Sequence, residues 1–452
     1  MKRFIYPALL VFASLTISCT DRLDLTPLSA IGENGFYQNA TEVEGAVIAI
    51  YDGLQDVPLR EFALTEMRSD NTRTRSSEGD WAEFESFDVQ ATNTAIASYW
   101  SANYNVIFRA NRVLENLEVV SSATLKTQFE GEARFTRALA HFNLVHAYGD
   151  VPLIDQVIIQ DDTDYFDRDA AATVLSTIAA DLSAARSLLP ETSDYGRATS
   201  GAASALLAKV MLTQEDYSGA EGILTELIAS GTYTLEPEYR DVFYSEGNGE
   251  VIFAIPYLDD DANESQDFSF EMTGGGAISG LNYMTDEFLA AMDPMDSVRN
   301  AVLVSTAHPA ENGKFITQSA DARLCGNDWI VMRYADVLLM QAEAIMAGAT
   351  STQDLDAIAA YNEVRQRVNL STLAVDGSET LTREMLLNER RFELAFENHR
   401  FYDLVRFGVA ESVLSEFATA NNFPFTATDL LLPIPQGEIN VSQGLLSQNP
   451  GY

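Results

Sequence analysis

Hydrophobic residues recur at helical spacing along most of this chain. The first such segment starts at Thr41, and its apolar residues follow at intervals of three and four: Val43, Val47, Ile50 and Leu54. This spacing predicts an amphipathic helix. The pattern returns, largely in consecutive pairs, at residues 98–117, 131–150, 173–190, 201–231, 333–348, 356–368 and 382–408. The chain is therefore predicted to be mostly α and built from helix pairs.

Small residues inside these segments indicate how the helices pack. ALLAKVML at 205–212 is followed by DYSGA at 216–220, and this order resembles one unit of a tetratricopeptide repeat. No strict period of about 34 residues survives along the chain. We therefore expect a degenerate tetratricopeptide-like scaffold in which alanine and glycine let neighbouring helices approach closely.

Two long stretches between the helices lack a helical pattern. Residues 57–97 are polar through their centre, and residues 231–330 combine a strand-like run at 250–258 with a Gly-rich segment. Long irregular segments of a compact domain often carry binding residues. We therefore expect long loops with a few short strands, and we place the binding surface on these loops.

The charge balance excludes several kinds of partner. Lys and Arg together number 28 against 67 Asp and Glu, which gives a formal net charge of −39. A surface this acidic repels phosphate backbones, so nucleic acid is not expected as a partner, and anionic membrane surfaces are disfavoured on the same grounds. The acidity fits a well-solvated surface, or a protein that works in salty water.

The N-terminus has the pattern of an export signal. Lys2 and Arg3 precede a short apolar run, and Cys19 follows the small residue Ser18. We interpret residues 1–18 as a lipoprotein signal peptide, residues 19–40 as a tether anchored by lipid on Cys19, and residues 41–452 as a single domain. The alternative is ordinary cleavage beside an incidental cysteine. With Cys19 lipidated, only Cys325 would remain, so no internal disulfide is expected.

The motifs of common enzymes and metal proteins are missing from the sequence. His141 and His146 lie five residues apart, about 140° around a helix, so they cannot share a metal from one face. The acidic run at 259–270 departs from an EF-hand at its sixth and twelfth positions, Glu264 and Phe270. Neither a phosphate-binding loop nor a GxSxG elbow is present. We therefore predict no catalytic residues, no metal site and no cofactor. A looser calcium site of oxygen ligands in the acidic loop stays as the alternative to a solvated loop.

The densest charged segment is NERRFELAFENHRFYDLVRFG, residues 388–408. On one continuous helix, Glu389, Glu393 and Glu397 would fall four residues apart, with Arg400 and Asp403 at the next spacings of three. Such spacings favour opposite-charge contacts along a helix. We interpret this segment as a packing device, not as an active site.

This segment and several others resemble the SusD-like (RagB/SusD) family. The other matching segments are SCTDRLDLTP at 18–27, RYADVLLMQAEA at 333–344, LLPIPQGEI at 431–439 and QNPGY at 448–452. The resemblance extends from Cys19 to Tyr452. It implies a scaffold of tetratricopeptide-like units and a lipid anchor on the outer membrane, facing the cell exterior. It also implies capture of oligo- or polysaccharide above a TonB-dependent SusC-like porin, without catalysis.

The resemblance also points to a glycan-binding loop near residues 68–81. Sugar rings stack on aromatic side chains, and their hydroxyls need polar partners. Asp70 and Asn71 match the acidic/amide pair that opens the family's loop, whereas Arg73 and Arg75 stand where aromatic residues are expected. Trp81 is the remaining aromatic candidate. For these arginines and Arg68, pairing with Glu66 and Asp70 is the alternative to glycan contact.

The second expected contributor is the Gly-rich loop. Its candidate is Tyr283, whereas Phe268 and Phe270 are assigned more readily to the core. The predicted glycan-binding residues are therefore Asp70, Asn71, Arg73, Arg75, Trp81 and Tyr283. Neutral and acidic glycans both remain open. Two other functions stay as alternatives, namely a surface glycoside hydrolase and a structural lid of the porin with no glycan affinity of its own.

Overall fold

The computed structural model describes residues 36–74, 79–159, 162–273, 281–306, 310–317, 319–321 and 323–452. The predicted signal peptide, the lipidation site Cys19 and the candidate Arg75 lie outside these ranges. Among the described residues, no helix combines the length and apolar character that a bilayer span requires.

Helices dominate the structure, which confirms the predicted fold class. They are α2 (Ala40–Gln55), α3 (Pro58–Leu64), α4 (Asp80–Glu85), α5 (Thr94–Glu115), α6 (Ala123–Tyr148), α7 (Ala171–Leu188), α8 (Ser200–Thr213), α9 (Tyr217–Ala229), α10 (Asp241–Tyr244), α11 (Phe268–Thr273), α12 (Asp286–Ala291), α13 (Ser297–Leu303), α14 (Tyr334–Met346), α15 (Leu355–Arg367), α16 (Arg383–Glu393), α17 (Arg400–Arg406), α18 (Ala410–Asn421) and α19 (Gln436–Val441). Short 3-10 turns include η3 (Glu66–Arg68).

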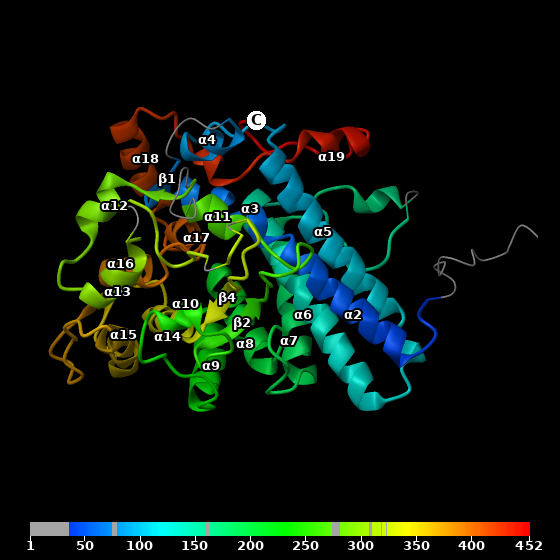
Figure 1. Cartoon of the computed structure of the whole chain (residues 1–452), viewed down its shortest axis with the longest axis horizontal. Helices are drawn as coiled ribbons and strands as arrows, with labels where there is room; N and C mark the ends of the chain where they lie inside the picture. Colours follow the sequence, from blue (N-terminus) through cyan, green and yellow to red (C-terminus); the bar gives the residue numbers. More distant parts are fainter. Residues whose placement is uncertain are drawn as a thin grey trace, which may run out of the picture.

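The long helices form one continuous row. α2 packs on α5, and the series continues through α6, α7, α8, α9, α14 and α15, each helix contacting the next (Figure 1). Small residues make this approach possible. A Cβ on Gly131 of α6 would lie 2.8 Å from Leu189 Cγ at the end of α7, so any larger residue would push the two helices apart. The degenerate tetratricopeptide-like scaffold is thereby confirmed.

Within the described ranges, the strands are short and pair in three antiparallel ribbons. β1 (Thr72–Arg73) pairs with β3 (Tyr283–Met284), β2 (Val251–Ile255) with β4 (Trp329–Arg333), and β5 (Ser351–Thr352) with β6 (Leu381–Thr382). The two predicted loop regions are more ordered than their sequences indicate. Helices α3 and α4 lie in the first, and α10, α11, α12 and α13 lie in the second.

The charged C-terminal segment is not one helix, and its predicted charge pattern is largely wrong. α16 ends at Glu393, and Phe396 and Asn398 take left-handed backbone conformations before α17 begins. Arg406 and Asp403 do pair along α17, at 2.8 Å. The three glutamates instead pair with cations that are distant in sequence.

Arg333 lies at the centre of these pairs. Its guanidinium lies 2.6 Å from Glu393, 2.6 Å from Glu397 and 2.7 Å from Glu250, and its side chain is almost fully buried. Arg299, Arg365, Arg367 and Lys314 bind the same group of glutamates, which includes Glu389. We call these residues the buried ion network. As predicted, this segment holds the scaffold together.

Candidate functional site

The two loop regions predicted to form the binding surface meet in the structure. Arg73 of β1 lies opposite Tyr283 of β3 in an antiparallel pair. Thr285 strengthens the junction, because its backbone N–H donates to the Asn71 carbonyl at 2.9 Å and its hydroxyl donates to the Asp70 carbonyl at 3.0 Å. Segments separated by about two hundred residues are therefore fixed side by side, near the top of Figure 1.

A second junction lies around Trp81. Helix α3 packs on α11, and Arg60 of α3 forms an ion pair of 2.9 Å with Asp267, just before α11. Trp81 on α4 stacks on the buried ring of Phe62, with centroids 5.6 Å apart and planes 15° from parallel. The Arg60 guanidinium lies 5.8 Å from the centre of the Trp81 ring. Trp81 stays half-buried, so it contacts the core and solvent at once.

Asp70 and Asn71 are buried beneath this surface. Arg400 donates two hydrogen bonds to the Asp70 carboxylate at 2.7 and 2.9 Å, and Arg391 lies 3.0 Å from the same group. Burial alone would raise the pKa of Asp70, but the hydrogen bonds and charges of these arginines outweigh it and hold the pKa below its ordinary value. Arg391 also donates to the Asn71 side-chain oxygen at 2.8 Å. These contacts tie the loop to the C-terminal scaffold.

The alternative pairing expected for the arginines is wrong for Arg68. Its guanidinium lies 4.2 Å from the centre of the Phe401 ring and donates to the backbone carbonyls of Leu64 and Asp429. Arg73 has a weak acidic neighbour, Asp286, at 4.0 Å, and 43% of its side chain is exposed. Arg73 therefore keeps donors that can reach a ligand.

The aromatic candidates of the second loop divide between core and surface. Phe268 is fully buried against Tyr257, Phe315 and Trp329, as expected for a core residue. Tyr283 is also buried, 6% exposed, so its contribution to the surface comes chiefly through its strand. Phe270 is half-buried beneath the Arg323 guanidinium, which lies 4.1 Å from the ring centre.

We call five side chains at these junctions the loop surface. Four are half-exposed and the last is exposed: Arg60, Arg73, Trp81, Phe270 and Arg323. Arg60 stands beside Trp81 and Arg323 beside Phe270, and the half-exposed Arg73 adds a third guanidinium, in a chain of strongly negative net charge. The sequence did not single out Arg60 or Arg323. Each contacts an aromatic ring that is distant in sequence, and no local pattern could have indicated that contact.

The described residues show no arrangement typical of an active site. His141 and His146 are buried, and burial lowers the pKa to about 4 for His141 and about 3 for His146. The His146 ring packs against the rings of Phe142 and Tyr402, whose centres lie 4.0 and 4.5 Å away. Within the described ranges, no group of three or more histidine, cysteine or acidic residues is placed to hold a metal ion.

Comparisons with known proteins agree with this architecture. A family model described as "SusD family" matches residues 310–452, and one described as "Starch-binding associating with outer membrane" matches residues 23–212. SusD-like protein P2 of Formosa agariphila is 26% identical, with all of both chains covered. A SusD-like protein of Bacteroides ovatus is 25% identical over 90% of this chain and 83% of its own.

Solved structures of similar proteins share this fold. A laminarin binding SusD-like protein is 28% identical, with 92% of this chain and 100% of that chain covered and a TM-score of 0.75. Surface glycan-binding protein A from Bacteroides thetaiotaomicron, in complex with laminarihexaose, shares the fold at 23% identity and a TM-score of 0.74, over 90% of this chain and 99% of that one. Since the two family models match the two ends of the chain and the relatives extend along nearly all of it, this protein belongs to the SusD-like family.

Proposed function

We propose that this protein captures oligo- or polysaccharide at the cell surface and acts with a TonB-dependent SusC-like porin in nutrient uptake. The observation that supports the proposal is the junction of the two loop regions through β1 and β3, together with the half-buried Trp81 that stacks on Phe62 beside Arg60. The described residues there offer ring stacking and hydrogen-bond donors, and none is arranged as an activated nucleophile.

The loop surface has the chemistry that sugar recognition needs. A pyranose ring has an apolar face that can stack on the exposed part of Trp81, which Phe62 holds in a fixed orientation from the core side. Arg60 and Arg73 can donate to the hydroxyls at the edge of the ring. Asp70 and Asn71 would support the site without contacting the glycan, because their hydrogen bonds to Arg391 and Arg400 fix the start of the loop. Tyr283 would also support the site indirectly, because its strand β3 pairs with the strand that carries Arg73. Arg75 stays a predicted ligand contact.

The names of the solved relatives suggest the first ligand to test. One is called laminarin binding, and another was solved with laminarihexaose. Both of these ligands are neutral glucans. Neutral hydroxyls suit a surface that combines an indole ring with arginine donors, and the acidic remainder of the chain disfavours polyanions. We therefore propose a neutral glucan as the first candidate ligand.

Lipid attachment at Cys19 would hold the protein on the outer membrane, facing the exterior. The proposal rests on the signal-like sequence before Cys19 and on the outer-membrane description of the family model. Growth of expressing cells with a labelled fatty acid, comparing wild type with Cys19→Ala, tests it. Label in the wild type alone supports the anchor, and equal labelling contradicts it.

The central experiment measures laminarihexaose binding by titration calorimetry, with Trp81→Ala beside the wild type. Loss of one stacking ring should weaken binding by about tenfold, since such a contact contributes roughly 1–1.5 kcal/mol. Phe108→Ala, which removes an aromatic side chain 51% exposed on α5, is the matched control and should change nothing. Equal affinity of all three proteins would show that the site is misplaced.

The same incubation separates the other functions. Reducing ends that accumulate over hours would indicate a glycoside hydrolase. A wild-type protein that binds no glycan while the porin co-purifies with it would indicate a structural lid. Binding without hydrolysis is the outcome that the geometry supports.

A further inference from the structure

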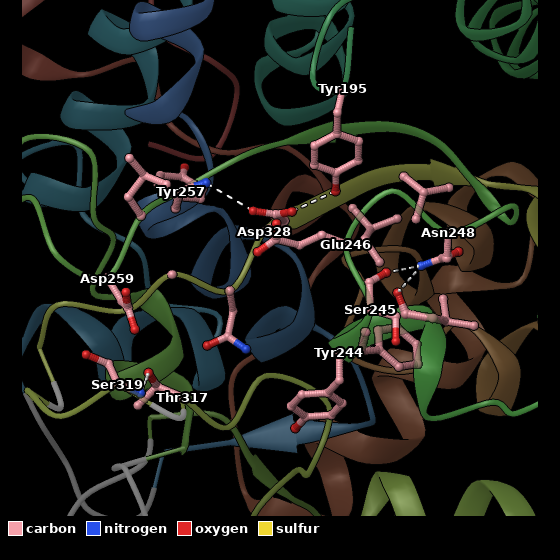
Figure 2. A pocket seen from close by; sticks show the side chains of 17 residues that line it. Tyr195, Tyr244, Ser245, Glu246, Asn248, Tyr257, Asp259, Thr317, Ser319 and Asp328 are labelled. Atoms are coloured by element: carbon pink, nitrogen blue, oxygen red, sulfur yellow. Dashed lines mark hydrogen bonds between the residues drawn. The ribbon is translucent and has the colours of Figure 1, made fainter.

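A separate cavity lies where β2 ends and β4 begins. Its volume is about 250 Å³. Several parts of the chain line it: Tyr195 between α7 and α8, residues 242–246 and 248 in and after α10, Val251 of β2, residues 257–259 after β2, Thr317 and Ser319, and residues 326–328 and Ile330 before and in β4. We call this space the Asp328 cavity (Figure 2). None of its lining residues belongs to the loop surface.

Asp328 is held in a fixed orientation at this cavity. One carboxylate oxygen accepts a hydrogen bond from the Tyr195 hydroxyl at 2.6 Å, and the other accepts from the Tyr257 backbone N–H at 3.0 Å, as Figure 2 shows. Each carboxylate oxygen can accept a second hydrogen bond. Burial, with a smaller contribution from the charge of Glu246, raises the pKa of Asp328 to about 6. At neutral pH it is therefore an oriented acceptor.

The aromatic walls are equally fixed. The Tyr244 hydroxyl donates to the Gly313 carbonyl at 2.6 Å, and the Tyr257 hydroxyl donates to the Gln55 carbonyl at 2.6 Å. Because backbone oxygens already accept both hydroxyl hydrogens, these tyrosines offer a ligand their ring faces. Tyr195, by contrast, is 42% exposed, a large aromatic residue left open to solvent beside the carboxylate. Fixed rings beside an oriented acceptor lower the entropy cost of binding.

The charge of the lining restricts the ligand. Glu246, Asp259 and Asp328 contribute carboxylates, and the described lining residues include neither lysine nor arginine. An anionic group would meet repulsion there without a compensating cation. Sugar hydroxyls, in contrast, donate well to carboxylates. The volume is below the range of roughly 300–1,000 Å³ typical of sites for drug-sized ligands, so it suits a single ring.

We propose that the Asp328 cavity is a second saccharide site, which holds one neutral sugar ring between tyrosine side chains while Asp328 accepts its hydroxyls. The proposal rests on the ligand class assigned to the protein, but not on the position of the Trp81 site. Residues 257–259 line the cavity, and Asp267, a few residues further on, pairs with Arg60 of the loop surface. The segment from residue 257 to residue 267 therefore connects the cavity to the loop surface along the chain.

Hydrogen-exchange mass spectrometry distinguishes the two sites. Laminarihexaose, cellohexaose and mannohexaose are the probes, and a hexamer of galacturonic acid is the anionic control. In the wild type, at least one neutral probe should slow exchange at residues 242–248, 257–259 and 323–328. The anionic hexamer should leave these segments unchanged. Trp81→Ala should keep this protection even where it loses protection of the loop surface.

Two variants test the cavity itself. Tyr195→Ala removes the exposed ring, and Asp328→Asn keeps the shape and an oxygen acceptor but removes the charge. Each should raise the concentration needed for half-maximal protection of the cavity segments by about tenfold, because a hydrogen bond to a charged acceptor or a stacked ring is lost. Protection of the loop surface should stay at its wild-type level in both.

The outcomes are separable. Protection of the loop surface without any protection of the cavity segments would overturn this proposal and leave the proposed function intact. Cavity protection that neither variant reduces, or that the galacturonate hexamer matches, would also overturn it. Protection nowhere would overturn both.

Discussion

Two regions of this protein both contain arginine side chains next to acidic residues, but they differ in how completely these arginines are buried and paired. In the buried ion network, Arg333 has an exposed fraction of 1% and contacts three glutamates. On the loop surface, Arg73 is 43% exposed, and among the described residues its acidic neighbour is Asp286, at 4.0 Å. A guanidinium surrounded by carboxylates has no donor left for a ligand, whereas a half-exposed one does. Burial and the completeness of pairing, not residue type, therefore separate the scaffold from the loop surface.

The largest effect should follow from breaking the buried ion network. Arg333→Met keeps the bulk of the side chain but leaves Glu250, Glu393 and Glu397 without their shared cation. Uncompensated buried charge should lower the free energy of unfolding by about 3–5 kcal/mol. Urea unfolding followed by circular dichroism measures it.

Its matched control is Arg323→Met, an arginine whose side chain is 60% exposed and which lies 3.0 Å from Glu271. Exposed pairs contribute little, so the expected loss is below about 1 kcal/mol. Similar losses in the two variants would contradict the distinction drawn between the regions.

The next prediction concerns Asp70, which belongs to the predicted binding loop and pairs with two arginines of the scaffold. Asp70→Asn removes the charge that faces Arg391 and Arg400 inside the protein. We expect a stability loss of about 3 kcal/mol, with weaker laminarihexaose binding because the loop is no longer fixed. Asp286→Asn, 87% exposed, should change the unfolding free energy by less than about 0.5 kcal/mol. A stable Asp70→Asn protein would mean that the loop holds its position without this pair.

A smaller effect should appear as a pH dependence at Glu66, which lies between the two regions. Burial raises its pKa from 4.5 to about 7, although the Asn398 N–H and the charge of Lys314 act against this. A group whose folded pKa is raised binds its proton more tightly in the folded state. Its stabilising contribution is therefore complete below pH 4.5 and is lost as the pH rises through about 7.

Glu66→Gln cannot titrate, and its amide oxygen can still accept the Asn398 N–H, now at 3.0 Å. Between pH 5 and 7, wild-type stability should therefore fall by about 2 kcal/mol relative to the variant. Urea unfolding of both proteins across this range measures the difference. A difference that stays constant with pH would show that Glu66 titrates normally.

The sequence predicted the scaffold well, and it predicted only some of the contacts around the candidate site. Apolar spacing located the long helices because it reports burial on one face. The charge pattern at 388–408 predicted contacts along a helix, but the chain breaks after Glu393, and the partners of its glutamates lie on other elements. Spacing within a segment holds no information about such partners. The partners of Asp70 could not be predicted from local spacing either, since Arg391 and Arg400 follow more than three hundred residues later.

The proximity of the two loop regions was predictable only from the family resemblance. Trp81 could be chosen from sequence because it is a large aromatic residue in a polar stretch. Arg60, which contacts both Trp81 and Asp267, could not be chosen, because it lies within a short helix that the polar pattern concealed. Half-exposure of a side chain is a property of tertiary packing, and it is this property that marks the loop surface.

The smallest expected effect concerns Arg73, the half-exposed arginine that was compared above with the buried Arg333. Arg73→Gln removes the charge but keeps a hydrogen-bond donor on β1. Stability should change by less than about 0.5 kcal/mol, because Arg73 is half-exposed and weakly paired. Affinity for a neutral hexasaccharide should fall by roughly 1 kcal/mol or less, the net value of one hydrogen bond. Arg186→Gln, on the scaffold helix α7, is the matched control and should leave affinity unchanged.

If a galacturonate hexamer instead binds the wild type more tightly than laminarihexaose and loses most of its affinity in Arg73→Gln, the charge of Arg73 rather than its donors recognises the ligand. The loop surface would then resemble the buried ion network after all, with the ligand supplying the missing carboxylate.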